Sequence, residues 1–126
     1  MKYLNAVGAL MLVVAVYFLL SQRPAPPDDP WFQQEVVNSP KLVLVKFGAD
    51  WCPPCRQLDA VLDRSEGRLD GVKIVRINVD EKPEIASHYG IAAIPHMMLF
   101  KEGKVVSTST GFQNADQLED WTKRYR

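Results

Sequence analysis

The sequence predicts an α/β domain in which a mixed central sheet of about four strands is flanked by helices. Segments with helical apolar spacing alternate with short β-branched, apolar runs along most of the chain. The run "KLVLVKFGA" (41–49) is apolar almost throughout, which is typical of a central strand buried on both faces. The 126 residues are 47% hydrophobic, which is enough to build the core of one domain.

The first element is the uncharged apolar segment "LNAVGALMLVVAVYFLL" (residues 4–20). As a helix it would span about 25 Å, at the short end for crossing a bilayer. It is apolar all round, unlike a helix that packs on a domain by one face. Lys2 precedes it and the first acids, Asp28 and Asp29, come well after it. We therefore expect the amino end to stay in the cytoplasm and the rest to be exported.

A cleaved signal peptide is the alternative to an uncleaved anchor. A signal peptide has a shorter apolar core and small residues before its cleavage site. Here the possible sites place Leu19 or Arg23 at the −3 position. The sequence therefore favours a transmembrane signal anchor over residues 1–20, a proline-rich linker over 21–30 and a folded domain over 31–126.

The linker "SQRPAPPDDP" contains four of the nine prolines and is expected to be extended. Asp28 or Asp29 can cap the helix that follows, with Pro30 in its first turn. Apolar residues at 31, 32, 36 and 37 form a helical stripe in this segment, "WFQQEVVNS". Trp31 and Phe32 are accordingly expected in the core, as is Trp121 near the end of the chain.

The remaining elements are expected in the order strand, helix, strand, helix, two strands and helix. The first of these helices begins at the cysteines, and the paired strands form a hairpin around Glu102 and Gly103. The last helix is capped by Asn114. After the strand at 41–49, the segments are "CRQLDAVLDRSEGRL", "GVKIVRINVD", "EKPEIASHYG", "HMMLFKEGKVVSTSTG" and "NADQLEDWTKRY".

The charge balance argues against one class of partner. Lys plus Arg and Asp plus Glu number 15 each, so the net charge is near zero. Because domains that bind nucleic acid usually carry a basic excess, nucleic acid is not an expected partner.

The two cysteines, Cys52 and Cys55, are separated only by prolines in "WCPPC". As a structural crosslink they would close a very short loop and constrain the unfolded chain little. A zinc site needs four ligands, of which His88 and His96 could supply two. The cysteines lie where a strand passes into a helix, and not on a zinc-binding turn. This position favours a redox centre over a metal site.

A redox role has a physical basis at this position. At a helix start, unpaired N–H groups and the helix dipole stabilise a thiolate, so Cys52 is the predicted nucleophile. Cys55 lies one turn further in and can resolve a mixed disulfide by attacking Cys52. Pro53 and Pro54 are tolerated in the first turn, where a missing N–H costs no helical hydrogen bond. No cofactor is expected, since the electrons pass through protein disulfides.

The segment around the cysteines resembles the thioredoxin family. The resemblance covers about residues 31–124 and rests on "LVLVKFGADWCPPCRQL" and "VKIVRINVDEKPEIASHYGIAAIPHMMLFKEGKVV". Its motifs are specific in combination: tryptophan before CxxC, Ile-Pro 40 residues after Cys55, a Lys-x-Gly hairpin and then Gly111. It implies a disulfide between Cys52 and Cys55.

The resemblance also implies a substrate groove. The Ile94–Pro95 peptide would be cis and face the cysteines, although a cis bond has a low prior from sequence alone. The backbone of Ile94 would pair with the substrate chain. Trp51, Ala93 and Gly111 would complete an apolar docking surface.

Lys46 is a departure from the family pattern. Thioredoxins carry a buried aspartate there, which is thought to handle the proton of the resolving cysteine. A neutral Lys46 could act as a base toward Cys55, and a charged one would favour its thiolate. The alternative is that only the stem is buried and the ammonium reaches the surface.

Arg76 stands where the family often has a lysine on the next strand. Two cations facing one cavity would repel, so Lys46 or Arg76 must turn outward or meet an acid. Asp50, Asp59 and Asp80 are the candidate acids, and the sequence does not choose among them.

Three further features depart from the family pattern. Pro53 replaces a glycine, which removes a backbone donor near the Cys52 sulfur and stiffens the turn. His96 follows the cis-proline, where it either shuttles protons or lies on the far face of the sheet. The family's first strand would fall on the linker and is expected to be absent.

Together these features predict a membrane-anchored thiol–disulfide oxidoreductase that reduces disulfides of exported proteins, with its domain in the bacterial periplasm. A reductant in an oxidising compartment must be recharged, so a membrane thiol–disulfide transporter is the expected electron donor. The alternatives are a disulfide oxidase or isomerase, and a non-catalytic assembly factor that holds partners in the cis-proline groove.

Overall fold

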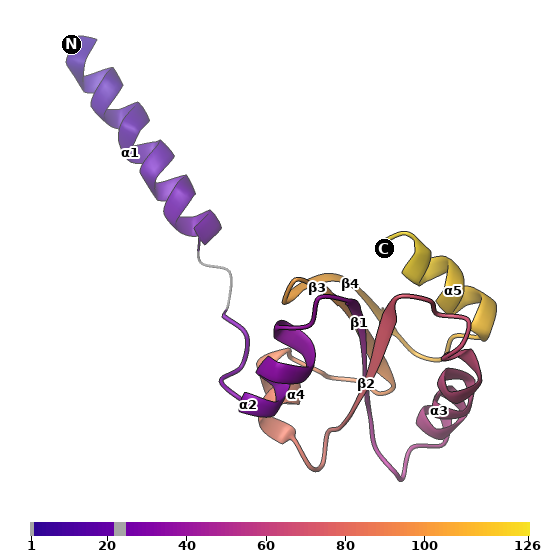
Figure 1. Cartoon of the computed structure of the whole chain (residues 1–126). Helices are drawn as coiled ribbons and strands as arrows, with labels where there is room; N and C mark the ends of the chain where they lie inside the picture. Colours follow the sequence, from indigo (N-terminus) through magenta and orange to yellow (C-terminus); the bar gives the residue numbers. More distant parts are fainter. Residues whose placement is uncertain (1, 22–24) are drawn as a thin grey trace.

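A computed structural model describes residues 2–21 and 25–126, so part of the predicted linker, residues 22–24, lies outside it. Figure 1 shows the elements, which follow the predicted order. They are α1 (Lys2–Ser21), α2 (Pro30–Phe32), the π-helix η1 (Gln33–Val37), β1 (Leu42–Gly48), α3 (Pro53–Ser65), β2 (Val72–Asn78), α4 (Pro83–His88), β3 (His96–Lys101), β4 (Lys104–Thr110) and α5 (Ala115–Lys123).

The apolar segment at the amino end forms the helix α1. Its large apolar side chains from Val7 to Leu20 are exposed, and Figure 1 shows the helix apart from the sheet. Over residues 2–21 and 25–126, no helix combines the length and the apolar character that crossing a membrane requires. Residues 25–29, at the end of the predicted linker, form neither helix nor strand.

Within residues 25–126 the sheet has four strands in the order β2-β1-β3-β4, which confirms the predicted mixed sheet. The central strand β1 runs parallel to β2 and antiparallel to β3, and β3 and β4 form the predicted hairpin. Glu102 and Gly103 at its tip both have positive φ, 53° and 77°. The two edge strands of the described sheet are therefore β2, beside β1, and β4, beside β3.

Two apolar layers form the core because both faces of β1 are buried. Alternate residues of a strand point to opposite faces, and all seven residues of β1 are buried. One face packs against α2, η1 and α4, and the other against α3 and α5, on opposite sides in Figure 1. The second face contains Leu42 and Leu44 of β1 and Leu58, Leu62, Leu118 and Trp121 of the helices.

The helix at the start of the domain corrects one prediction. Asp29 is its cap and accepts a hydrogen bond from the Phe32 N–H at 2.8 Å. Phe32 is fully buried as predicted, but Trp31 is 38% exposed, so its assignment to the core was wrong. Neighbouring helical residues point in different directions, and here only Phe32 faces the sheet. The Trp31 ring lies under the Lys82 ammonium, 4.7 Å from the ring centroid.

The last helix begins as predicted at Asn114. The Asn114 side chain accepts from the Gln117 N–H and the Gln117 side chain accepts from the Asn114 N–H, both at 2.9 Å. We expect Asn114→Ala to lower the free energy of unfolding by about 1 kcal/mol, because this capping box satisfies two free donors. Urea denaturation measures the change. The exposed Asn38→Ala is the control and should shift stability by less than about 0.5 kcal/mol.

Candidate active site

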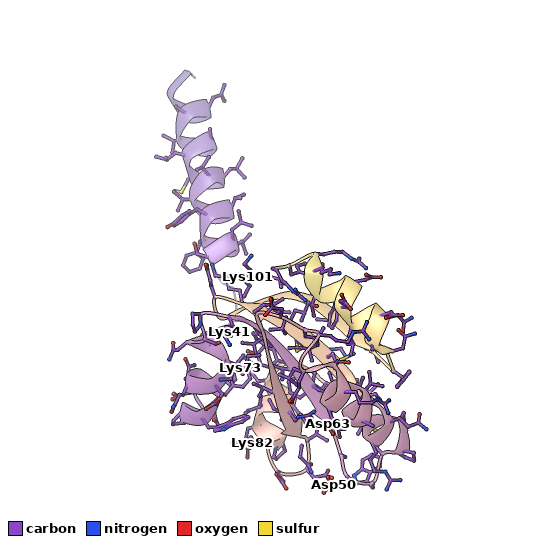
Figure 2. The ribbon with its side chains drawn as sticks, turned by 45° about the vertical axis from the view of Figure 1, so that its right-hand side comes forward. Lys41, Asp50, Asp63, Lys73, Lys82 and Lys101 are labelled. Carbon is purple, nitrogen blue, oxygen red and sulfur yellow. A yellow bond between two sulfur atoms is a disulfide. The ribbon has the colours of Figure 1, made fainter. Side chains whose placement is uncertain are left out.

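Both cysteines lie at the end of the sheet where β1 passes into α3. Figure 2 labels Asp50 in this connection. Cys52 is the N-cap of α3, and its sulfur is bonded to that of Cys55, with the two Cα atoms 5.2 Å apart. Cys52 is 4% exposed and Cys55 is fully buried. The predicted disulfide is therefore present, with Cys52 nearer to the surface.

The two prolines leave a single helical donor for the Cys52 sulfur. Pro53 and Pro54 occupy the first two positions of α3 and have no N–H. The next residue is Cys55, whose N–H donates to Cys52 Sγ at 3.3 Å. In the reduced protein this N–H and the helix dipole would stabilise negative charge on Cys52.

The loop before β3 lies against the disulfide. The Ile94–Pro95 peptide is cis, as the family resemblance implies. Ile94 packs on a small buried cluster formed by Ala49, Cys52 and Cys55. Gly111, with φ of 96°, donates its N–H to the Pro95 carbonyl at 2.8 Å. The structure thus brings Ile94, Pro95 and Gly111 together beside the cysteines.

Trp51 provides an exposed aromatic surface at this site. Its side chain is 67% exposed, and its indole N–H donates to Asp80 Oδ2 at 2.8 Å. Asp80, one of the three candidate acids for Lys46 and Arg76, therefore binds Trp51. Ala93 is also exposed, and Phe112, next to Gly111, is 49% exposed.

Lys46 points into the α3 face of the sheet and meets an acid there. Its Nζ lies 2.8 Å from Asp59 Oδ1, and its side chain is 6% exposed. The alternative that its ammonium reaches the surface is therefore wrong. Of the three candidate acids, Asp59 is therefore the partner of Lys46. Asp50 has no ion pair among the described residues. The position of Asp59 in α3, one turn after Cys55, is the signal in the sequence that could have identified it, because it puts both side chains on one face of the helix.

Arg76 meets acids on α3, so the two cations do not face each other unpaired. Its Nε lies 3.2 Å from Asp59 Oδ1, the oxygen that also binds Lys46. Its Nη2 lies 2.6 Å from Asp63 Oδ1. The side chain is 35% exposed, so Arg76 reaches solvent while Lys46 does not.

His96 lies on the other face of the sheet from Lys46. It pairs with Phe47 across β1 and β3, and Phe47 belongs to the layer under α2 and α4. Its Nδ1 is 2.8 Å from Thr110 Oγ1. Partial burial lowers the pKa of His96 from its ordinary value because it disfavours the charged ring.

This pKa shift predicts a pH dependence of stability. The unfolded chain binds a proton at His96 near pH 6.5, whereas the folded chain binds it only at lower pH. Stability should therefore fall as the pH drops below about 6.5. In urea denaturation, His96→Gln should lose less stability than wild type between pH 7.5 and 5.5. The exposed His88→Gln is the control, and an equal effect of both variants would contradict the assignment.

Comparison with known proteins agrees with this geometry. The thioredoxin family matches residues 25–124 of the chain. A thioredoxin of Rickettsia felis is 43% identical over 97 residues, which cover 76% of this chain and 92% of that protein. A thioredoxin of Porphyra purpurea is 43% identical over 98 residues, covering 77% and 92%. A thioredoxin 1 of Synechococcus elongatus is 48% identical over 84 residues, covering 66% and 78%.

The matched residues 25–124 contain both cysteines, the Ile94–Pro95 peptide and the buried residues of both core layers. These relatives are more than 40% identical to the chain over most of their own length, so the similarity lies in the sequence as well as in the fold. With its Cys52–Cys55 pair, the protein is a thiol–disulfide oxidoreductase, and the chain belongs to the thioredoxin family.

Proposed function

We propose that this protein is a membrane-anchored reductant of disulfides in exported proteins. The observation that carries the proposal is a buried CxxC disulfide in a domain that follows an apolar segment, residues 4–20, without charged side chains. Thiol–disulfide exchange is the reaction of the thioredoxin family. The membrane anchor, the compartment and the class of substrate are what we propose for this protein.

The exchange uses the two cysteines in sequence. In the reduced protein the Cys52 thiolate attacks a substrate disulfide, forming a mixed disulfide and releasing one substrate thiolate, which takes up a proton. Cys55 then loses its proton, and its thiolate attacks Cys52 Sγ. This step breaks the mixed disulfide and releases the second substrate thiolate. The substrate gains two electrons, and Cys52–Cys55 becomes the disulfide that the structure contains.

The substrate chain is proposed to bind across the surface around Cys52. The proposed docking surface consists of Trp51, Ala93, Ile94 and Gly111. It is supported by the packing of Ile94 on the cysteines and by the exposed indole of Trp51. Asp80 fixes the orientation of this indole through its hydrogen bond. The backbone of Ile94 beside the cis-proline provides polar groups for an extended chain.

Residues 4–20 are proposed to anchor the domain with its carboxyl-terminal part outside the cytoplasm. The support comes from the segment itself, which has no charged residue and exposes its apolar side chains. The charge order around it favours a cytoplasmic amino end. A periplasmic domain would need its electrons from a membrane thiol–disulfide transporter, since the surrounding pool is oxidising.

Membrane fractionation tests the anchor. The full chain should sediment with membranes and resist extraction by carbonate, and a variant lacking residues 4–20 should be released. In intact cells, protease added from outside should digest the wild-type domain once the outer membrane is opened. A wild-type domain that stays protected would overturn the proposed compartment, and one that is washed off by carbonate would overturn the anchor.

The direction of electron flow is tested by the reduction potential of the Cys52–Cys55 pair. Four residues are proposed to modulate it: Pro53 and Pro54 lie between the cysteines, Lys46 lies near Cys55 across Gly48, and Pro95 follows Ile94, which packs on the cysteines. The full chain in detergent would be equilibrated with thiol buffers and the reduced fraction trapped by alkylation. A potential at or below about −230 mV supports a reductant. A potential between roughly −120 and −180 mV supports a disulfide oxidase or isomerase instead.

A further inference from the structure

A cavity of about 320 Å³ opens on the α3 face of the sheet, and its wall includes Ala49, which packs on both cysteines. Its wall includes Gly48 and Ala49 at the end of β1. Most of the remaining lining is charged, and every packed element contributes: Lys46 from β1, Arg76 from β2, Arg56 and Asp59 from α3, and Asp50 and Glu81 from the loops. Thus the charges that line this cavity come from several elements and are of both signs.

The Lys46 ammonium and the Cys55 side chain both lie close to Gly48. A Cβ atom added to Gly48 would be 2.7 Å from Lys46 Nζ and 3.3 Å from Cys55 Cβ. The ammonium and the cysteine therefore border the same small space above Gly48. This space exists only because residue 48 has no side chain.

Asp59 holds the ammonium in this position. It follows Cys55 by one helical turn, so both side chains lie on the face of α3 that packs on the sheet. Its Oδ1 binds both Lys46 Nζ, at 2.8 Å, and Arg76 Nε, at 3.2 Å. Lys46 and Arg76 are direct neighbours in the parallel pairing of β1 and β2. Without the shared carboxylate, the two cations would repel and the buried ammonium would lose its ion-pair partner.

We propose that Asp59 is a positioning residue for the resolving step, which keeps the Lys46 ammonium beside the Cys55 sulfur. The inference rests on the proposed exchange reaction, in which Cys55 must become a thiolate. A nearby ammonium stabilises that thiolate, and the proton released by Cys55 passes to solvent through the cavity. Cys55 Sγ then bonds to Cys52 Sγ, and the leaving thiolate of the substrate takes up a proton.

The resolving step can be observed with an aromatic disulfide whose released thiol absorbs light. The reduced full chain in detergent would be mixed with this probe in a stopped-flow instrument at a series of pH values. The first thiol is released by Cys52 and the second by Cys55. The pH at which the second release is half-maximal reports the ionisation of Cys55.

Asp59→Asn should raise this midpoint by roughly one pH unit, so that the second release at pH 7 slows about tenfold. Asp63→Asn is the matched control, because Asp63 lies on the same helix, binds Arg76 and does not bind Lys46. Figure 2 labels Asp63 on α3. Lys46→Met should raise the midpoint as Asp59→Asn does. In the Lys46→Met background, Asp59→Asn should add no further rise, because it acts through the lysine.

The outcomes separate the inference from the function beneath it. An Asp59→Asn midpoint equal to or below that of wild type would overturn the inference. A rise that Asp59→Asn still causes in the Lys46→Met background would overturn it too, and so would an equal rise in Asp63→Asn. If wild type releases no second thiol, the proposed exchange reaction fails and the inference fails with it. Circular dichroism confirms that each variant is folded before its kinetics are compared.

Gly48→Ala provides a second test without changing any charge. Its methyl group would occupy the space of the Lys46 ammonium and push it away from Cys55. We expect the midpoint of the second release to rise while the first release keeps its wild-type rate. A wild-type midpoint in this folded variant would overturn the proposed place of the ammonium.

Discussion

Cys52→Ser is expected to abolish disulfide reduction completely. A serine hydroxyl at the start of α3 is not ionised at neutral pH and cannot form a disulfide, so neither the first attack nor the product remains. The measurement is the reduction of insulin disulfides by the full chain in the presence of dithiothreitol. The rate should fall to that of dithiothreitol alone.

Cys55→Ser should also lose turnover, but in a different way. Cys52 can still attack, so substrate should accumulate as a mixed disulfide that is visible on a non-reducing gel. Both variants should stay folded, since the disulfide closes a loop across a separation of three residues and adds little to stability. If Cys55→Ser trapped no substrate while Cys52→Ser did, the assignment of nucleophile and resolving cysteine would be reversed.

Phe32→Ala is expected to lower the free energy of unfolding by about 3–4 kcal/mol. The ring is fully buried, and its centroid lies 5.7 Å from those of Tyr89 and Phe100. It joins the helix at the start of the domain to α4 and to the sheet. Removing the ring leaves a cavity that the surrounding rigid elements cannot fill. Urea denaturation of the two full-length proteins in the same detergent measures the loss.

Trp31→Ala is the matched control for this prediction. The two residues are adjacent in the same short helix, but Trp31 is 38% exposed and packs mainly under Lys82. Its loss should cost about 1 kcal/mol, the order of an exposed cation–π contact with partial burial. Equal losses for the two variants would mean that the helix, and not the buried ring, determines the effect.

The order of elements could be predicted because each signal is local. The run at 41–49 is apolar except for its two lysines, which predicts burial on both faces, and the structure buries all of β1. Asp29 and Asn114 cap their helices through contacts within three residues along the chain. Trp31 was wrongly placed because a stripe of four apolar positions does not say which of two neighbours faces the sheet.

The contacts within the candidate site were harder to predict from the sequence. The alternation of a strand puts Lys46 on the same face as Leu42 and Leu44, but three acids could have met it, and the choice depends on how α3 packs across the sheet. The cis peptide at Ile94–Pro95 followed from the resemblance alone, since most X-Pro bonds are trans. Gly48 gave no signal, because its role comes from the space that it leaves for a side chain two residues away.

The position of β2 at the edge of the sheet has a consequence for association. An edge strand offers backbone donors and acceptors to which another strand can add, a common start of aggregation. β2 carries one cation on each face: Lys73, 2.5 Å from Glu35, and Arg76, bound by acids of α3. Charged side chains held in place along an edge oppose pairing with a second copy. The ion pairs of this strand thus help to keep neighbouring molecules apart at high local concentration.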